Sequence, residues 1–145
     1  MLKPSNYRIL AVGKIRRPWI QQGIKHYLPR LPGLTITEIR NGNLEKETQA
    51  IHSSIKTGEL IIAVTEEGEN ISSLTLSKRL QELGSHRIVF IIGGADGLTP
   101  ETKTTANWQL SLSPLTFPHE LARLLLVEQL YRAISISQGS PYHKG

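Results

Sequence analysis

Residues 88–97 read IVFIIGGADG, an uninterrupted apolar run that passes directly into a glycine-rich turn. Such a run of consecutive apolar residues is typical of a strand that is buried on both faces of a parallel sheet. A second run, LIIAV at residues 60–64, indicates a neighbouring strand of the same kind. The two runs predict the centre of a largely parallel α/β sheet.

The rest of the chain alternates between strand and helix patterns around this centre. Pro18 suits the first position of a helix, and Asn43 and Ser72 suit helix N-caps. The pattern contains no repeats or long linkers and predicts one domain over residues 1–145, a three-layer α/β/α fold with a mostly parallel sheet. Further strands are expected at residues 8–12, 34–39 and 108–112, and helices at 18–27, 44–55, 73–83 and 119–136.

Composition excludes several classes of protein. The chain has 145 residues and no cysteine, which excludes disulfides, thiolate metal sites and a cysteine nucleophile. No stretch approaches the roughly 18 apolar residues of a membrane span, and the short N-terminal apolar run contains Arg8, unlike a signal peptide. The histidines are scattered without the spacing of metal ligands. We therefore expect a soluble cytoplasmic protein with no membrane partner and no metal.

Basic residues are concentrated at the start of the chain. Residues 1–40 contain eight Lys or Arg against Glu38 alone, a charge of +7 within a total of +5. A basic surface of this kind is what binding to a phosphate backbone requires. A positive charge also favours solubility, so charge alone leaves a nucleic-acid partner and an ordinary solvated surface both open.

Two loops lie between a predicted strand and a predicted helix, where α/β proteins bind ligands. The glycine turn at residues 93–97 is neither a dinucleotide fingerprint nor a phosphate loop, and it suits either a ligand site or a tight turn with positive φ. The loop at residues 112–118 is stiffened by two prolines. Its Leu115 and Phe117 would cover a ligand or plug the core beneath the last helix.

The last predicted helix, residues 119–136, is apolar nearly all round. A surface helix needs only one apolar stripe, so this helix should be buried by the sheet and by a second subunit, which predicts a homodimer. Glu128 and Arg132 are spaced to form an ion pair on its surface. The tail that follows, with Tyr142 and His143, has the character of a disordered end when it is considered alone.

Several motifs occur in an order that resembles a known family. Residues 10–14, 92–98, 112–119, 128–133 and 141–143 are similar to the RlmH (YbeA-like) ribosomal RNA large-subunit methyltransferases, which belong to the SPOUT class. The resemblance implies a homodimer with a deep trefoil knot in its C-terminal part. It also implies transfer of a methyl group from S-adenosyl-L-methionine to N3 of a pseudouridine in the large ribosomal RNA, so that ribosomal RNA or the ribosome would be the partner.

The resemblance also assigns site residues. The implied catalytic group is Arg132, Tyr142 and His143, with Tyr142 and His143 closing over the target base and Arg132 binding its phosphate or stabilising developing negative charge. Because S-adenosylmethionine has no phosphate, the glycine turn would serve close backbone approach to the adenine and ribose. The implied cofactor contacts are Val64, Gly93, Leu112, Ser113, Pro114, Leu115, Thr116 and Phe117.

Two other functions compete with this one. A non-catalytic RNA-binding factor for ribosome assembly would share the basic N-terminal third but would not bind S-adenosylmethionine. An enzyme that binds a small nucleotide is disfavoured by the absence of a phosphate-loop lysine.

Overall fold

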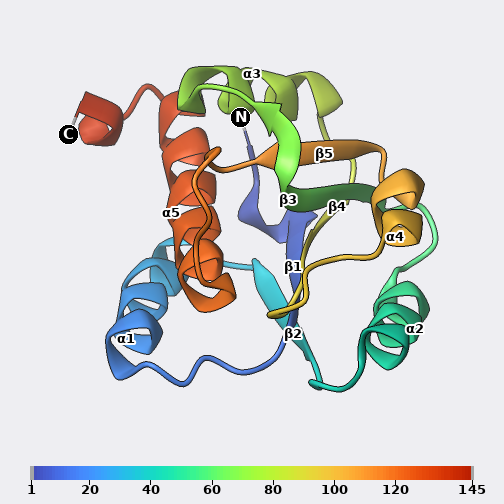
Figure 1. Cartoon of the computed structure of the whole chain (residues 1–145). Helices are drawn as coiled ribbons and strands as arrows, with labels where there is room; N and C mark the ends of the chain where they lie inside the picture. The colour runs from blue at the N-terminus through green and yellow to red at the C-terminus, as the bar shows by residue number, and fades with distance from the viewer. Residues whose placement is uncertain (1, 145) are drawn as a thin grey trace.

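A computed structural model describes residues 2–144, which form one five-stranded parallel sheet with helices on both faces (Figure 1). The strand order is β2-β1-β4-β3-β5, so the two apolar runs are neighbours near the middle of the sheet, as predicted. The strands are β1 (Tyr7–Val12), β2 (Thr35–Ile39), β3 (Leu60–Asn70), β4 (Ile88–Ile92) and β5 (Trp108–Ser111). The helices are α1 (Pro18–Tyr27), α2 (Leu44–Ser54), α3 (Ser73–Leu83), α4 (Pro100–Thr105) and α5 (His119–Ser137), with short 3-10 turns at Pro4–Asn6, Leu28–Arg30 and Pro141–Lys144.

The predicted helix starts are confirmed by their hydrogen bonds. The Asn43 side chain accepts from the Lys46 amide (2.8 Å) at the start of α2. The Ser72 hydroxyl accepts from the Thr75 amide (3.1 Å) at the start of α3. Each bond satisfies a backbone donor that the first turn of a helix leaves unpaired.

The sheet separates two apolar layers. Alternate side chains of a strand point to opposite faces, so Ile9 and Ala11 pack with α3 and α5 while Leu10 and Val12 pack on the α2 side. Helices α1, α3 and α5 lie on one side of the sheet and α2 and α4 on the other (Figure 1). The three-layer α/β/α prediction is therefore confirmed.

Strand β3 is longer than the sequence predicts. It continues past Val64 to Asn70, and its pairing with β5 shifts register between Val64 and Glu69. At Gly68 the two strands approach so closely that a Cβ atom would lie 2.6 Å from the carbonyl carbon of Leu110. The apolar pattern ends early because residues 65–70 are half-buried or exposed rather than enclosed by helices.

Helix α5 supplies much of the core on its face of the sheet. Leu126, Val127, Leu130 and Ala133 are buried, and α5 packs against both α1 and α3. Its other apolar side chains, including Leu121 and Leu125, stay half-buried in the single chain. No helix within residues 2–144 combines the length and apolarity needed to cross a membrane.

Candidate functional site

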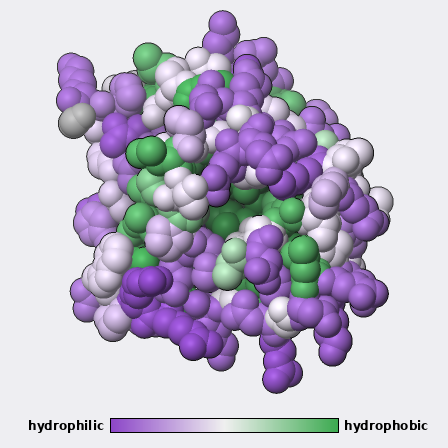
Figure 2. Space-filling view, in the orientation of Figure 1, coloured by the Kyte–Doolittle hydropathy of each residue, from purple (hydrophilic) through white to green (hydrophobic). Residues whose placement is uncertain are grey.

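A hollow opens at the carboxyl edge of the sheet, where β3, β4 and β5 meet the first turns of α5. Its volume is about 370 Å³. Figure 2 shows it near the middle of one face, with an apolar floor and a hydrophilic rim. Of the predicted cofactor contacts, Pro114 and Thr116 are exposed and lie off the wall. The others line the hollow: Val64, Gly93, Leu112, Ser113, Leu115 and Phe117.

The glycine turn forms one wall of this hollow with its backbone. The Gly97 amide donates to the Gly94 carbonyl (3.0 Å), and Gly97 has a φ of +73°. A Cβ atom on Gly93 would lie 2.6 Å from the carbonyl group of Gly97. The interpretation as a tight turn that needs glycine is therefore confirmed. The turn also borders the hollow, and its use as a ligand site stays a prediction.

The loop at residues 112–118 forms the opposite wall and is held by its own hydroxyl groups. The Ser113 hydroxyl accepts from the Leu115 amide (3.0 Å), and the Ser111 hydroxyl donates to the Ser113 carbonyl (2.9 Å). Thr116 donates to Glu66 of β3 (2.8 Å), so it fixes the loop without lining the hollow. Leu115 is 69% exposed at the rim, where an apolar side chain gains most by covering a ligand.

An ion pair that sequence reasoning missed crosses the rim. Lys103 of α4 lies 2.6 Å from Glu67 of β3, and both residues line the hollow. A carboxylate after an apolar strand and a lysine on a short helix each look like ordinary surface residues in the sequence. Only the fold brings them together.

A second ion pair clamps the outer part of β3. Arg79 of α3 forms two hydrogen bonds with Glu69 (2.7 and 2.8 Å), and the Trp108 indole donates to the same carboxylate (3.1 Å). These contacts, led by Arg79, lower the pKa of Glu69 to about 2. The carboxylate is therefore charged throughout the neutral range.

The three predicted catalytic residues lie together at the far end of α5. Arg132 donates to Glu128 (2.8 Å), which confirms the predicted ion pair. Another Arg132 nitrogen lies 3.3 Å from Nδ1 of His143, and the guanidinium carbon lies 5.0 Å from the centre of the Tyr142 ring. Arginine can only donate, so this contact requires an unprotonated Nδ1 on His143.

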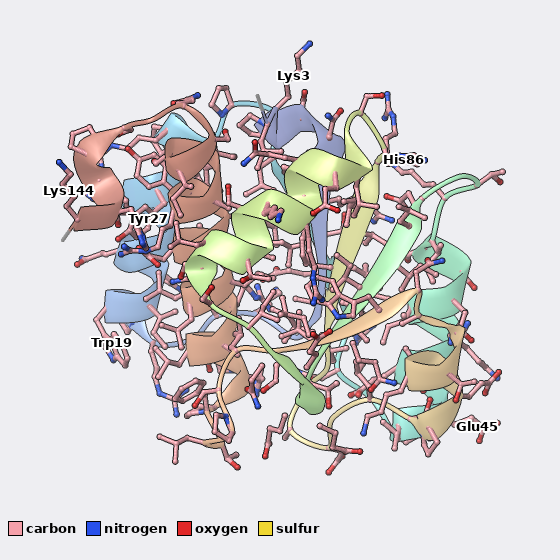
Figure 3. All side chains as sticks on the ribbon, turned by 90° about the horizontal axis from the view of Figure 1, so that it is seen from above. Lys3, Trp19, Tyr27, Glu45, His86 and Lys144 are labelled. Carbon is pink, nitrogen blue, oxygen red and sulfur yellow. The ribbon has the colours of Figure 1, made fainter. Side chains whose placement is uncertain are left out.

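The tail is ordered by Tyr142, so the prediction of a disordered end is wrong. The Tyr142 hydroxyl donates to Glu128 (2.8 Å) and lies 3.0 Å from the Tyr27 hydroxyl of α1, which must therefore be the donor of that bond. The Tyr142 ring also packs edge-on against Tyr131 (4.7 Å between centroids). In Figure 3, Tyr27 and the end of the chain near Lys144 lie on the same side of the molecule. Burial, followed by the bonds to Tyr27 and Glu128, raises the pKa of Tyr142, which keeps its proton at neutral pH.

Within one chain, the predicted catalytic residues lie apart from the predicted cofactor contacts. Helix α5 contributes His119 and Ala122 to the hollow, whereas Arg132 lies ten residues beyond Ala122. At a rise of 1.5 Å per residue this spacing is about 15 Å along the helix. The structure brings the catalytic candidates together and most of the cofactor contacts together, but it does not bring one group to the other.

Two buried side chains of α5 anchor the loop between β1 and α1, and sequence reasoning missed this role for both. Glu120 accepts from the backbone amides of Arg16 (2.9 Å) and Arg17 (3.1 Å). Burial alone would raise the pKa of Glu120, but these bonds and the charge of Arg17 outweigh it and lower the pKa. Arg123, which is 2% exposed, donates to the Gly13 carbonyl (2.8 Å) and to Glu38 (2.6 Å).

The basic N-terminal third is not uniformly available to a partner. Arg8 is buried and paired with Glu59 (2.8 Å), and it also donates to the Ser54 carbonyl (2.7 Å). The charge of Arg8 is therefore neutralised by Glu59 inside the protein and does not contribute to a binding surface. Within residues 2–144, no group of three or more histidine or carboxylate side chains is placed to hold a metal ion.

A parallel α/β domain with a hollow built from the loops at its carboxyl edge defines a small-molecule-binding α/β protein. Residues 5–143 match the family described as "Predicted SPOUT methyltransferase". Since the match spans nearly the whole chain, the protein belongs to the SPOUT methyltransferase family. The resemblance found in the sequence motifs is confirmed.

Relatives of similar length share most of the sequence. The chain is 61% identical over 144 residues to the ribosomal RNA large subunit methyltransferase H of Prochlorococcus marinus strain MIT 9211, covering 99% of each chain. It is 62% identical over 144 residues to the protein of the same name from a second strain of Prochlorococcus marinus, again covering 99% of each. The protein of that name from Synechococcus strain CC9902 is 59% identical over 143 residues, with 99% of each chain covered.

A solved structure shares the fold at low sequence identity. A probable methylase family protein from Haemophilus influenzae Rd KW20 superposes with a TM-score of 0.64 at 14% identity. The superposition covers 95% of this chain and 70% of the other. This likeness supports the fold.

Proposed function

We propose that this protein is an S-adenosylmethionine-dependent methyltransferase that acts in the cytoplasm on large-subunit ribosomal RNA, with N3 of a pseudouridine in 23S RNA as its target. The observation that carries the proposal is the hollow built from the loops after β3, β4 and β5 in a chain of the SPOUT family. The names of full-length relatives support the choice of RNA substrate.

The residues of the hollow fit S-adenosylmethionine. A volume of about 370 Å³ lies within the range of small-molecule sites. The glycine turn offers backbone donors and acceptors for an adenine and a ribose, and Leu115 and Phe117 offer apolar cover. Glu66 and Asp96, which line the hollow and form no ion pair among the described residues, supply negative charge that suits a cationic sulfonium. When bound there, the cofactor would supply an electrophilic methyl group.

The target nitrogen sets a separate requirement. N3 of a uracil ring is an imide and becomes a good nucleophile only as its proton leaves. Positioning supplies much of the acceleration, and a general base typically adds about 10²–10⁴-fold. We assign His143 and Tyr142 to the target base and Arg132 to its phosphate or to the developing charge. The contact with Arg132 occupies the lone pair of His143 Nδ1. This nitrogen can therefore accept a proton only after the His143 ring has moved away from Arg132.

The separation along α5 supports a site shared between two subunits. In one chain the tail group lies about 15 Å from the hollow, measured along the helix. In a homodimer the tail of one subunit would complete the hollow of the other. The half-buried apolar residues of α5 and the 58% exposed Trp19 of α1, which lies at the edge of the molecule in Figure 3, offer a surface for such an interface.

The same proposal includes a deep trefoil knot in the C-terminal part of the chain. The loop after β4 and the loop after β5 border one hollow, and α5 then returns to pack against α1 and α3 on a single face of the sheet. That course of the chain is compatible with α5 passing through an earlier loop. Mechanical extension of the chain by its two ends would test the knot, because a knotted chain stops short of its full contour length.

The proposed function is tested by methyl transfer in solution. Purified protein, isotopically labelled S-adenosylmethionine and ribosomes from cells that lack the protein should give labelled N3-methylpseudouridine in 23S RNA. If calorimetry detected no binding of S-adenosylmethionine while ribosomes still bound, the protein would be a non-catalytic assembly factor. Cofactor binding without transfer to any ribosomal particle would contradict the choice of substrate.

A further inference from the structure

We propose that Lys14, Arg16 and Arg40 form a basic ledge that binds backbone phosphates of the RNA beside the hollow. This inference rests on the proposed function and deepens it, because it names the surface on which an RNA substrate would dock.

The register of the sheet brings Lys14 and Arg40 together, and Arg16 follows Lys14 two residues along the same loop. Val12 of β1 pairs with Ile39 of β2, and the Gly13 amide continues the ladder to the Ile39 carbonyl (2.7 Å). Lys14 and Arg40 therefore follow the ends of two strands that lie about 4.8 Å apart. All three ledge side chains are exposed. In Figure 2 strongly hydrophilic surface lies below the hollow, over the segment that joins β1 to α1.

The charge of the ledge is not cancelled within the chain. Two carboxylates beside the loop at residues 13–17 are already engaged, Glu120 by Arg17 (3.1 Å) and Glu38 by Arg123 (2.6 Å). In the part of the chain that the structure describes, none of the three ledge residues forms an ion pair. Three unpaired cations on one edge provide the electrostatic contact that a phosphate backbone needs.

The ledge is held at a fixed position relative to the hollow. Glu120 and Arg123 hold the loop at residues 13–17 by hydrogen bonds, while His119 and Ala122 of the same helical turns line the hollow. On the other side, a Cβ atom on Gly94 of the glycine turn would lie 3.1 Å from Val12, so the end of β1 adjoins the cavity wall.

This arrangement favours RNA over other anionic partners. Phosphate contacts fix the register of a nucleic acid without reading its sequence. A ledge rigidly joined to the cofactor hollow would set the distance from a bound phosphate to the base that receives the methyl group. An anionic membrane would gain nothing from a neighbouring small-molecule cavity.

A charge-matched pair of variants tests the ledge. The test variant is K14Q/R16Q/R40Q. The control K3Q/K56Q/R87Q removes the same charge from exposed residues that precede β1, β3 and β4, at the opposite edge of the sheet. Binding of each protein to purified bacterial ribosomes is measured by co-sedimentation over a range of salt concentrations, and binding of S-adenosylmethionine is measured by calorimetry.

The test variant should bind ribosomes on the order of 10-fold more weakly at about 50 mM salt. The negative slope of log affinity against log salt should become shallower by about 2 to 3, because three phosphate contacts are lost. The control should match the wild type, and all three proteins should bind S-adenosylmethionine equally. If the test variant bound ribosomes as tightly as the control, the ledge would be refuted with the methyltransferase proposal intact.

Two further outcomes separate the remaining possibilities. A wild-type protein that binds neither ribosomes nor S-adenosylmethionine would contradict the proposed function itself. Equal, ledge-dependent binding to phosphatidylglycerol vesicles would overturn the assignment to RNA, because it would mark the ledge as a general anion or membrane surface.

Discussion

At the scale of single residues, Tyr142 connects the end of the chain to α5 and α1. Its hydroxyl donates to Glu128 and is within hydrogen-bond distance of Tyr27, and its ring lies against Tyr131 and Arg132. The order of the tail could not be predicted from local sequence, because these partners lie on two helices that only the fold brings together. The family motif, and not periodicity, predicts a catalytic role for Tyr142 and His143.

Replacing Tyr142 with Phe should loosen the tail while keeping the ring contacts. We expect a loss of about 1.5–3 kcal/mol in the free energy of unfolding, since the bond donated to the charged Glu128 disappears together with the bond accepted from Tyr27. We also expect slower single-turnover methylation with unchanged affinity for S-adenosylmethionine. Urea unfolding, rapid-quench kinetics and calorimetry measure the three quantities. Unchanged methylation kinetics would remove the Tyr142 hydroxyl from the reaction.

The ionisation of Glu69 should make the stability of the fold depend on pH. Its pKa is about 2 in the folded protein and near 4.5 when unfolded, so its ionised form stabilises the fold above pH 4.5 and that contribution is lost as the pH falls toward 2. Glu69→Gln should therefore be less stable than the wild type at pH 6 and nearly as stable at about pH 2. Urea unfolding across this range measures the difference. If the difference in free energy of unfolding between the two proteins stayed constant with pH, the charge of Glu69 would not be what stabilises the fold.

At the scale of the elements, most helices and strands follow directly from the sequence. Helix α1 and strand β4 have the predicted bounds, because Pro18 and the apolar run define them locally. The continuation of β3 to Asn70 could not be predicted, since this polar extension pairs with β5 alone and is stabilised by that pairing and not by burial. The anchoring of the loop at residues 13–17 was missed for the same reason, as Glu120 and Arg123 lie more than 100 positions along the chain from their partners.

Removing the Glu120 carboxylate should release this loop from α5. In Glu120→Ala the amides of Arg16 and Arg17 lose their acceptor, and we expect a loss of about 1–3 kcal/mol in the free energy of unfolding. Amide hydrogen exchange should accelerate at residues 14–17 and stay unchanged in β4. Glu45→Ala, at an exposed position of α2, serves as the control. Equal exchange in both variants would show that Glu120 does not hold the loop.

At the scale of the whole molecule, the proposed active site combines the hollow of one subunit with the tail of the other. We expect His143→Ala to be inactive because its tail is incomplete, and Phe117→Ala to be inactive because its hollow is damaged. When the two variants are mixed and allowed to exchange subunits, the mixed dimer should regain one functional site, with an intact hollow from the His143→Ala chain and an intact tail from the Phe117→Ala chain. Methylation assays on the mixture check this, and a mixture as inactive as its components would mean that each chain uses its own tail.

Nucleoside mass spectrometry of 23S RNA shows whether this protein methylates ribosomal RNA in the cell. RNA from cells that lack this protein should contain no N3-methylpseudouridine. The wild-type gene should restore it, whereas Gly93→Ala should not, because a Cβ atom there would lie 2.6 Å from the Gly97 carbonyl and displace the wall of the hollow. An unchanged level of N3-methylpseudouridine in the deficient cells would show that this protein does not methylate that base.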